Sequence, residues 1–127
     1  MGNIRGYEQY KEQSITTMTK SEMLIFLYDE VIKRLTKAKI LGYNKEYTEF
    51  EREIVRAREI INYFEQTLDR RYPVSAGLSK MYDFINYELA RALAGRNVDI
   101  VDEVMPFLIE LRDTWREADK LSRVKSS

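Results

Sequence analysis

The chain has 127 residues, with 21 lysines and arginines balanced by 21 aspartates and glutamates, and it contains neither cysteine nor histidine. This length fits one domain with a single buried core, and the zero net charge gives no electrostatic reason to expect nucleic acid or an anionic membrane as a partner. The missing residue types exclude a disulfide framework, a thiolate nucleophile and the commonest metal ligands.

An N-terminal leader, residues 1–18, precedes the first long periodic segment. Ile4, Tyr7 and Tyr10 are spaced three apart and would share one face of a short helix. Such a leader can dock on its own bundle or on a partner, and it can equally be an inert terminus. Periodicity alone does not choose between these interpretations.

The first long helix is predicted to begin at Thr19 and to end at Gly42. Thr19 and Glu22 have the spacing of a capping box, in which each side chain accepts a hydrogen bond from the other residue's amide. Gly42 can adopt the positive φ that often follows a last helical turn. Between them an apolar stripe repeats every three or four residues: Leu24, Leu27, Val31, Leu35 and Ala38.

The second and third helices are predicted to be separated by Tyr72-Pro73, because proline pushes the preceding residue out of the α region. The third helix is expected to stop near Gly95. The stripe of the second helix is Phe50, Ile54, Ala57, Ile61, Phe64 and Leu68. The stripe of the third is Leu78, Tyr82, Ile85, Leu89 and Ala92.

The fourth helix is predicted to follow Asn97 as its N-cap and to contain Pro106. A proline inside a helix deletes one backbone hydrogen bond and crowds the preceding turn, at a cost of roughly 3 kcal/mol or a kink. We expect a bent helix, and a bend that opens a groove for a partner is the functional alternative. The stripe is Val101, Val104, Leu108, Leu111, Trp115 and Ala118.

These segments predict an all-α fold, an antiparallel up-down-up-down four-helix bundle over residues 19–121, followed by a tail at residues 122–127. Connections of only a few residues place consecutive helices antiparallel. Each helix would have about 20 residues and a length of roughly 30 Å. A three-helix alternative would require two segments to merge across Gly42 or Pro73.

Candidate catalytic and metal-binding residues are sparse. Ferritin-like bundles need Glu-x-x-His pairs, which this chain cannot supply. Helical nucleotide pyrophosphohydrolases bind magnesium through acid pairs at i,i+3, a spacing that Glu46–Glu49 and Glu110–Asp113 also have. Acid-rich helices produce such pairs by chance, and these two lie far apart in the sequence. We therefore predict a protein that is not an enzyme and that has no metal and no cofactor.

No stretch of the chain approaches the roughly 18 apolar residues of a membrane-spanning helix. The start, from Met1 to Tyr7, also lacks the apolar run of a signal peptide. We therefore expect a cytoplasmic location without membrane insertion.

Apolar residues exceed those that four core stripes need. A second apolar face indicates a groove for a partner or a contact between copies, and methionine and tyrosine suit such surfaces. The alternative is that these residues widen the core. Together with the leader, the predicted partner-binding residues are Ile4, Tyr7, Tyr10, Met23, Phe26, Ile60, Tyr63, Met105, Phe107 and Ile109.

Four short motifs follow one another along the chain. They are Tyr7-Glu8-Gln9-Tyr10, Leu27-Tyr28-Asp29, Leu78 with Tyr82-Asp83, and Leu111-Arg112-Asp113-Thr114-Trp115. Each motif alone is weak, but their order, their spacing and the total length resemble the FliS family of flagellar export chaperones. The similarity extends over residues 7–118, and Pro106 departs from the expected pattern.

The resemblance implies a cytoplasmic chaperone that binds the disordered C-terminal segment of flagellin in hydrophobic grooves between its helices. Binding would prevent premature polymerisation and help to deliver flagellin to the flagellar type III export apparatus. Ile4, Tyr7 and Tyr10 would cover the empty groove and move aside for flagellin. A homodimer of the free chaperone is also compatible with the resemblance.

The same resemblance implies that the other motif residues fix the bundle. Tyr28 would be buried, Asp29 would find an internal hydrogen-bond donor, and Trp115 would pack at one end. Arg112 or Asp113 would serve in a similar way.

Two other functions compete with the flagellin chaperone. A general helical adaptor or dimerisation module would use the same surplus apolar face, and a metal-dependent nucleotide hydrolase would use the acid pairs. Binding of a flagellin tail separates the chaperone from the adaptor, and magnesium-dependent stabilisation would favour the hydrolase.

Overall fold

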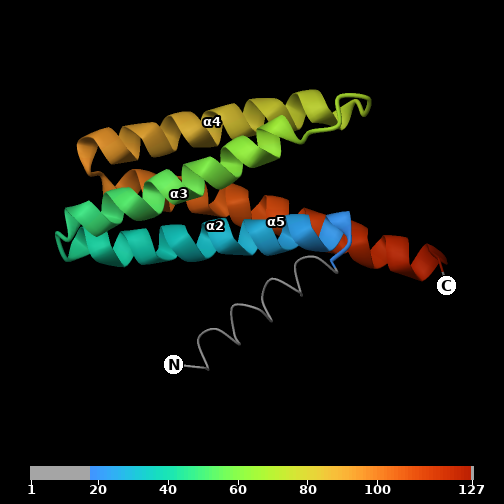
Figure 1. The fold of residues 1–127 in the computed structure, drawn as a ribbon, viewed down its shortest axis with the longest axis horizontal. Coiled ribbons are helices and arrows are strands. Elements are labelled where there is room, and N and C mark those ends of the chain that lie inside the picture. Colours follow the sequence, from blue (N-terminus) through green and yellow to red (C-terminus); the bar gives the residue numbers. More distant parts are fainter. Residues whose placement is uncertain (1–17, 127) are drawn as a thin grey trace, which may run out of the picture.

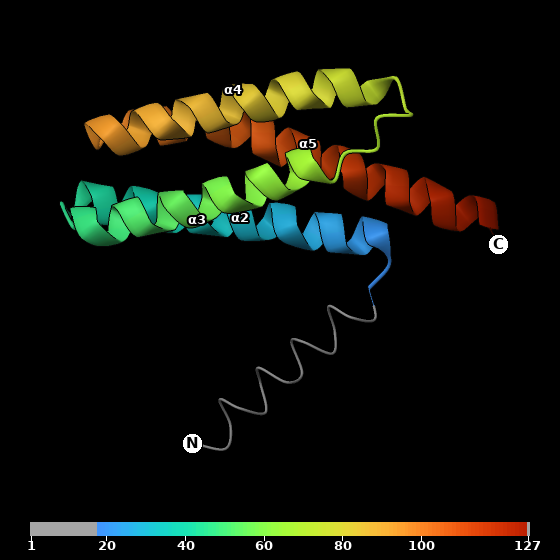
Figure 2. The same cartoon turned by 45° about the horizontal axis from the view of Figure 1, so that its top comes forward.

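Four α-helices in antiparallel succession form the described part of the structure (Figure 1). The computed structural model describes residues 18–126, which hold α2 (Lys20–Tyr43), α3 (Tyr47–Gln66), α4 (Val74–Gly95) and α5 (Val98–Ser126) and no strand. Helix α2 packs against α3 and α5, and α4 packs against the same two helices from the other side (Figure 2). The predicted all-α, up-down-up-down bundle is confirmed.

Two of the predicted helix starts are fixed by side-chain caps. Thr19 Oγ1 accepts a hydrogen bond from the Glu22 amide at 3.2 Å, and Asn97 Oδ1 accepts one from the Asp99 amide at 3.0 Å. Only the first half of the predicted capping box forms in the described chain, because Glu22 Oε1 instead accepts a hydrogen bond from Arg123 Nη2 of α5 at 2.8 Å. The carboxylate thus links two helices rather than closing its own first turn.

The prediction that Gly42 ends the first helix at positive φ is wrong. Helix α2 continues through Gly42 to Tyr43, and the left-handed backbone in this connection belongs to Lys45, with φ of 59°. Gly42 is buried, and a Cβ atom there would overlap Val98 Cγ2 and lie 3.1 Å from Phe50 Cδ2. Glycine is required because α3 and α5 approach α2 closely at this point.

Gly42→Ala should therefore destabilise the bundle by about 1–3 kcal/mol, the usual effect of overpacking a tight contact. Gly77→Ala is the matched control, because a Cβ atom there would have no neighbour within 4 Å. The control should stabilise α4 by about 0.4–1 kcal/mol, since alanine restricts the unfolded chain. Urea unfolding measures both changes, and equal effects of the two substitutions would contradict this account of Gly42.

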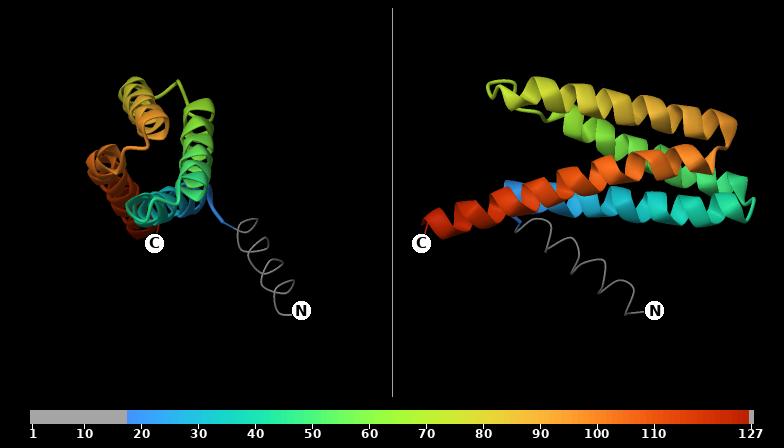
Figure 3. Two further views of the ribbon diagram at one scale, coloured as in Figure 1. Left: turned by 90° about the vertical axis from the view of Figure 1, so that its left-hand side faces the viewer. Right: turned by 180° about the vertical axis from the view of Figure 1, so that it is seen from behind.

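The ends of α3 and α5 differ from the predictions. Helix α3 stops at Gln66 rather than at Tyr72-Pro73, with Thr67 as its C-cap and the Thr67 hydroxyl donating to the Tyr63 carbonyl at 2.8 Å. Helix α5 has 29 residues and continues on both sides of Pro106. Figure 3 shows it as one unbroken helix. Its C-terminal end therefore projects beyond the other helices in Figures 1 and 2.

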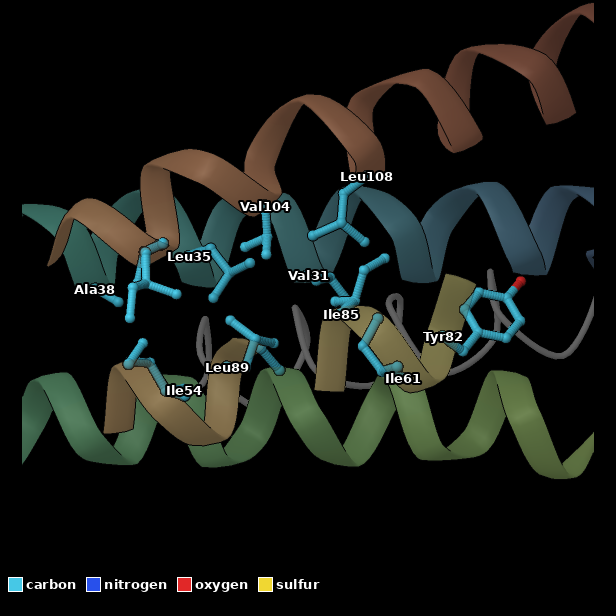
Figure 4. Close-up of a cluster of buried hydrophobic side chains, with 14 of the residues drawn as sticks. Val31, Leu35, Ala38, Ile54, Ile61, Tyr82, Ile85, Leu89, Val104 and Leu108 are labelled. Carbon is cyan, nitrogen blue, oxygen red and sulfur yellow. The ribbon is translucent and has the colours of Figure 1, made fainter. Parts of the chain in front are cut away.

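The core lies along the axis of the bundle, and every described helix contributes to it (Figure 4). The predicted stripe positions supply most of the side chains. Leu24, Leu27, Leu68, Leu78, Leu111 and Trp115 are only partly buried against the core, and Ala118 is exposed. The buried hydrophobic residues are Tyr28, Val31, Leu35, Ala38, Leu41, Phe50, Ile54, Ala57, Ile61, Phe64, Tyr82, Ile85, Leu89, Ala92, Ile100, Val101, Val104 and Leu108.

Candidate functional site

An aromatic cluster ties the four helices together within the core. The hydroxyl oxygens of Tyr28 on α2 and Tyr82 on α4 are 2.5 Å apart, and the Phe64 ring of α3 stacks on Tyr28 with centroids 4.4 Å apart. Trp115 of α5 packs against the core. The predicted burial of Tyr28 is confirmed, and its hydroxyl is hydrogen-bonded to that of Tyr82 on α4.

Burial also changes the acid–base behaviour of this cluster. Desolvation raises the pKa of Tyr28 well above its ordinary value, and the neighbouring Tyr82 raises it further. Burial likewise raises the pKa of Tyr82, partly opposed by the hydrogen bond to Tyr28. Both hydroxyls therefore stay neutral in the folded protein at pH values where tyrosines of the unfolded chain ionise.

The stability of the fold should consequently decrease as the pH rises above about 10, where the unfolded chain releases these two protons and the folded chain keeps them. Below this pH the two buried tyrosines make their full contribution to the stability of the fold. Tyr82→Phe should make the alkaline decrease shallower and should destabilise the fold at neutral pH by about 1–3 kcal/mol, because the Tyr28 hydroxyl loses a partner. Urea unfolding between neutral and strongly alkaline pH measures both effects; a slope identical to that of the wild type would argue against the buried pair.

Ion pairs join α2 to α5 along their length. Asp29 lies 3.1 Å from Arg112 Nη1 and 3.1 Å from Arg116 Nη2, so its predicted donor is found on α5. Farther along, Lys39 pairs with Asp102, and its hydrogen bond lowers the pKa of that carboxyl. Exposed pairs of this kind contribute little individually, but they fix which residues of α2 and α5 face each other.

Polar contacts also join α3 to its two neighbours. Arg34 of α2 binds Glu53 of α3 at 3.2 Å. Between α3 and α4, Asn86 donates to Asn62 at 2.7 Å, and the Ser79 hydroxyl donates to Glu65 at 2.7 Å.

The contact between α4 and α5 has a different character, because aromatic side chains line it. Phe84 of α4 and Phe107 of α5 meet edge to face with ring centroids 5.4 Å apart, although their exposed fractions are 43% and 37%. Tyr87, one turn along α4, is 64% exposed. Within residues 18–126, no side-chain hydrogen bond or ion pair joins these two helices. We call Phe84, Tyr87 and Phe107 the α4–α5 aromatic patch.

The predicted partner-binding residues are distributed over several faces of the bundle. Ile60 and Met105 pack against the core, whereas Tyr63 and Phe107 are exposed. Ile60 also lines a hollow between α2 and α3. The other described members, Met23, Phe26 and Ile109, are partly buried, and Ile109 lines a second hollow along α5 beside Pro106. Ile4, Tyr7 and Tyr10 lie outside the described residues.

Sequence reasoning missed Phe84 and Tyr87. Both are apolar or aromatic residues outside the core stripe of the third helix, which is the same signal that selected Tyr63 and Phe107 on other helices. Phe84 follows the buried Tyr82 by two residues, so the helical period places it on a different face. Its contact with Phe107 depends on the packing of α4 against α5.

The acid pairs that suggested a magnesium site lie on different parts of the bundle. Glu46 immediately precedes α3, whereas Glu110 and Asp113 belong to α5. In the described part of the chain, histidine, cysteine, aspartate and glutamate residues form no group of three or more that could hold a metal ion. None of the described helices is both long enough and apolar enough to cross a lipid bilayer.

Comparison with known proteins gives a consistent family. The model of the family described as flagellar protein FliS matches residues 3–122. The flagellar secretion chaperone FliS of Bacillus subtilis (strain 168) is 26% identical over 117 residues, covering 92% of this chain and 88% of the relative. A crystal structure of a bacterial flagellar chaperone has the same fold, with a TM-score of 0.76 and 19% identity over 93% of this chain and 98% of that one. Because the family match spans nearly the whole sequence, the resemblance of the ordered motifs is confirmed, and the chain belongs to the FliS family of flagellar chaperones.

Proposed function

We propose that this protein is a cytoplasmic chaperone that binds the disordered C-terminal segment of flagellin in hydrophobic grooves. Binding keeps flagellin from polymerising before export and assists its delivery to the flagellar type III export apparatus. The observation that supports this proposal most directly is the α4–α5 aromatic patch. Its residues Phe84, Tyr87 and Phe107 are exposed to solvent and do not belong to the buried core.

Such a patch suits an amphipathic segment that folds as it binds. Helix-in-groove recognition inserts apolar residues at spacings of three and four, and partly exposed aromatic side chains make the strongest contacts in such interfaces. The α4–α5 contact suits insertion because no ion pair between these helices, within the described chain, has to break first. The other three helix contacts carry polar links, whose groups would lose their partners if the helices separated.

Calorimetric titration with a C-terminal flagellin peptide from the same organism tests the proposal. We expect one-to-one binding with a negative heat-capacity change, which marks the burial of apolar surface. A scrambled peptide of the same composition should not bind, since it lacks the helical spacing of apolar residues. Absence of binding heat at several temperatures would contradict the flagellin assignment and favour a helical adaptor with another protein partner.

The leader prediction has its own test. Tyr7→Ala combined with Tyr10→Ala should leave the helical circular dichroism and the thermal midpoint unchanged and should alter the affinity for the flagellin peptide. The physical reason is that these residues share a predicted helical face able to occupy the groove. Unchanged affinity in the double variant would show that the leader does not compete with flagellin.

A further inference from the structure

Two rows of side chains with opposite charge lie on helices that are not neighbours in the bundle. The α3 row consists of Arg52, Arg56 and Ile60, and the α5 row consists of Asp113, Glu117 and Leu121. Both rows have the spacing i, i+4, i+8, and in both the two charged residues precede the apolar one. A row with this spacing forms a continuous ridge on the surface of a helix.

The α3 row combines unneutralised positive charge with apolar surface. Arg52 and Arg56 form no ion pair with any described residue, whereas the nearby Glu53 is already bound by Arg34 at 3.2 Å. The three residues of the row line a hollow together with Arg34, Val55 and Glu59, and Val55 is 42% exposed. This surface therefore suits a partner that carries carboxylates beside an apolar side chain.

The α5 row has that composition. Glu117 makes no ion pair within residues 18–126, and Asp113 is 58% exposed although it accepts a hydrogen bond from the adjacent Arg112 at 3.2 Å. Both acids line a hollow with Pro106, Ile109 and Glu110. Leu121 is 55% exposed and lies five residues before the end of α5. The C-terminal end of this helix projects beyond the other helices in Figure 1.

The two ridges match each other in one relative direction. Ridges of i±4 spacing pack side by side when two helices cross at about −50°. With both helices running in the same general direction, Arg52 would meet Asp113, Arg56 would meet Glu117, and Ile60 would meet Leu121. In the opposite direction Arg52 would meet Leu121, and one carboxylate would face Ile60. Glu59 lies three residues after Arg56, and Lys120 lies three residues after Glu117. These two flanking residues also carry opposite charges.

We propose that the α3 row of one molecule binds the α5 row of a second copy of this chain. The rows of a single molecule cannot pair in this way, because both α3 and α5 pack against α2 and α4 and lie diagonally across the bundle. The contact is heterologous, so it joins molecules head to tail. The zero net charge of the chain leaves little overall repulsion between copies.

The charged residues of the two rows can be altered separately from the predicted flagellin-binding residues. Arg52, Arg56, Asp113 and Glu117 belong neither to the α4–α5 aromatic patch nor to the predicted partner-binding set, which shares only Ile60 with the rows. Failure of one proposal therefore leaves the other standing.

Sedimentation velocity of the full chain over a concentration series up to about 0.5 mM tests the contact. At low salt the weight-average mass should rise above the 15.1 kDa monomer with concentration, and high salt should reduce the association because it screens the charged rows. The α3 variant is Arg52→Glu with Arg56→Glu, and the α5 variant is Asp113→Arg with Glu117→Arg. Each alone should weaken association by at least about tenfold, the effect expected for placing like charges together.

Mixing the two variants gives the sharpest result. In the mixture, the acidic α3 row of one variant meets the basic α5 row of the other, and the two unaltered rows are also complementary. Equal amounts should therefore associate although neither variant does so alone.

Lys33→Glu with Lys80→Glu is the control variant. It changes the net charge as the α3 variant does but alters two exposed lysines outside both rows, and it should retain self-association. The proposal would be overturned if the wild-type protein stayed monomeric at low salt, or if the two row variants associated as the wild type does. A mixture that stays monomeric would also overturn it. So would a lysine control that loses self-association as strongly as the row variants.

Discussion

Replacing Phe64 with alanine should lower the free energy of unfolding by about 3–5 kcal/mol, the range for deleting a buried aromatic ring. Phe64 is 1% exposed, stacks on Tyr28, and lies with its ring centroid 5.6 Å from that of Tyr82. The substitution would therefore open a cavity between α2, α3 and α4, where neighbouring rings cannot collapse without breaking the Tyr28–Tyr82 hydrogen bond.

The matched control is the preceding residue of the same helix. Tyr63 is 41% exposed, so Tyr63→Ala removes an aromatic ring of similar size mostly from water and should cost no more than about 1 kcal/mol. Urea unfolding followed by circular dichroism at 222 nm measures both variants. Similar destabilisation by the two substitutions would show that Phe64 does not organise the core.

Loss of the α4–α5 aromatic patch should weaken flagellin binding more than any other surface change considered for this protein. Phe84→Ser combined with Phe107→Ser should reduce the affinity for the C-terminal flagellin peptide by at least about 100-fold, because each aromatic anchor of such an interface contributes about 2 kcal/mol or more. The fold should persist, since both rings are already partly in water. Calorimetric titration and thermal unfolding of the same sample separate binding from stability.

Ile40→Ser combined with Val74→Ser provides the control for this experiment. These side chains are 58% and 63% exposed and lie near the end of α2 and at the start of α4, outside the patch. The control should retain wild-type affinity. If it lost affinity as strongly as the patch variant, general surface hydrophobicity rather than the α4–α5 contact would be responsible.

The polar links between helices explain why this contact is the one proposed to admit a client. Arg112 and Arg116 hold Asp29 across α2 and α5, and Asn62 with Asn86 joins α3 to α4. Separation of these helices would leave these polar groups without their partners, which is unfavourable for the part-buried pair of Arg112 with Asp29. The contact between Phe84 and Phe107 can instead be exchanged for an equivalent apolar contact with a bound segment.

The sequence by itself determined the features that depend on short-range spacing. The period of the apolar stripes places the core residues on one face of each helix, and the caps at Thr19 and Asn97 depend on residues two or three positions away. The helix order and the family also follow from local motifs, such as Leu27-Tyr28-Asp29, together with their separation along the chain.

Only the tertiary structure decided the features that depend on residues distant in the sequence. Gly42 is needed because Val98 and Phe50 crowd it, and Glu22 leaves its capping role for Arg123. Ile60 and Phe107 have similar apolar side chains outside the main stripes, yet one packs against the core and the other remains exposed. Helical periodicity fixes the direction in which a side chain points around the axis of its helix. Burial depends on which neighbouring helix lies on that side and how closely it packs.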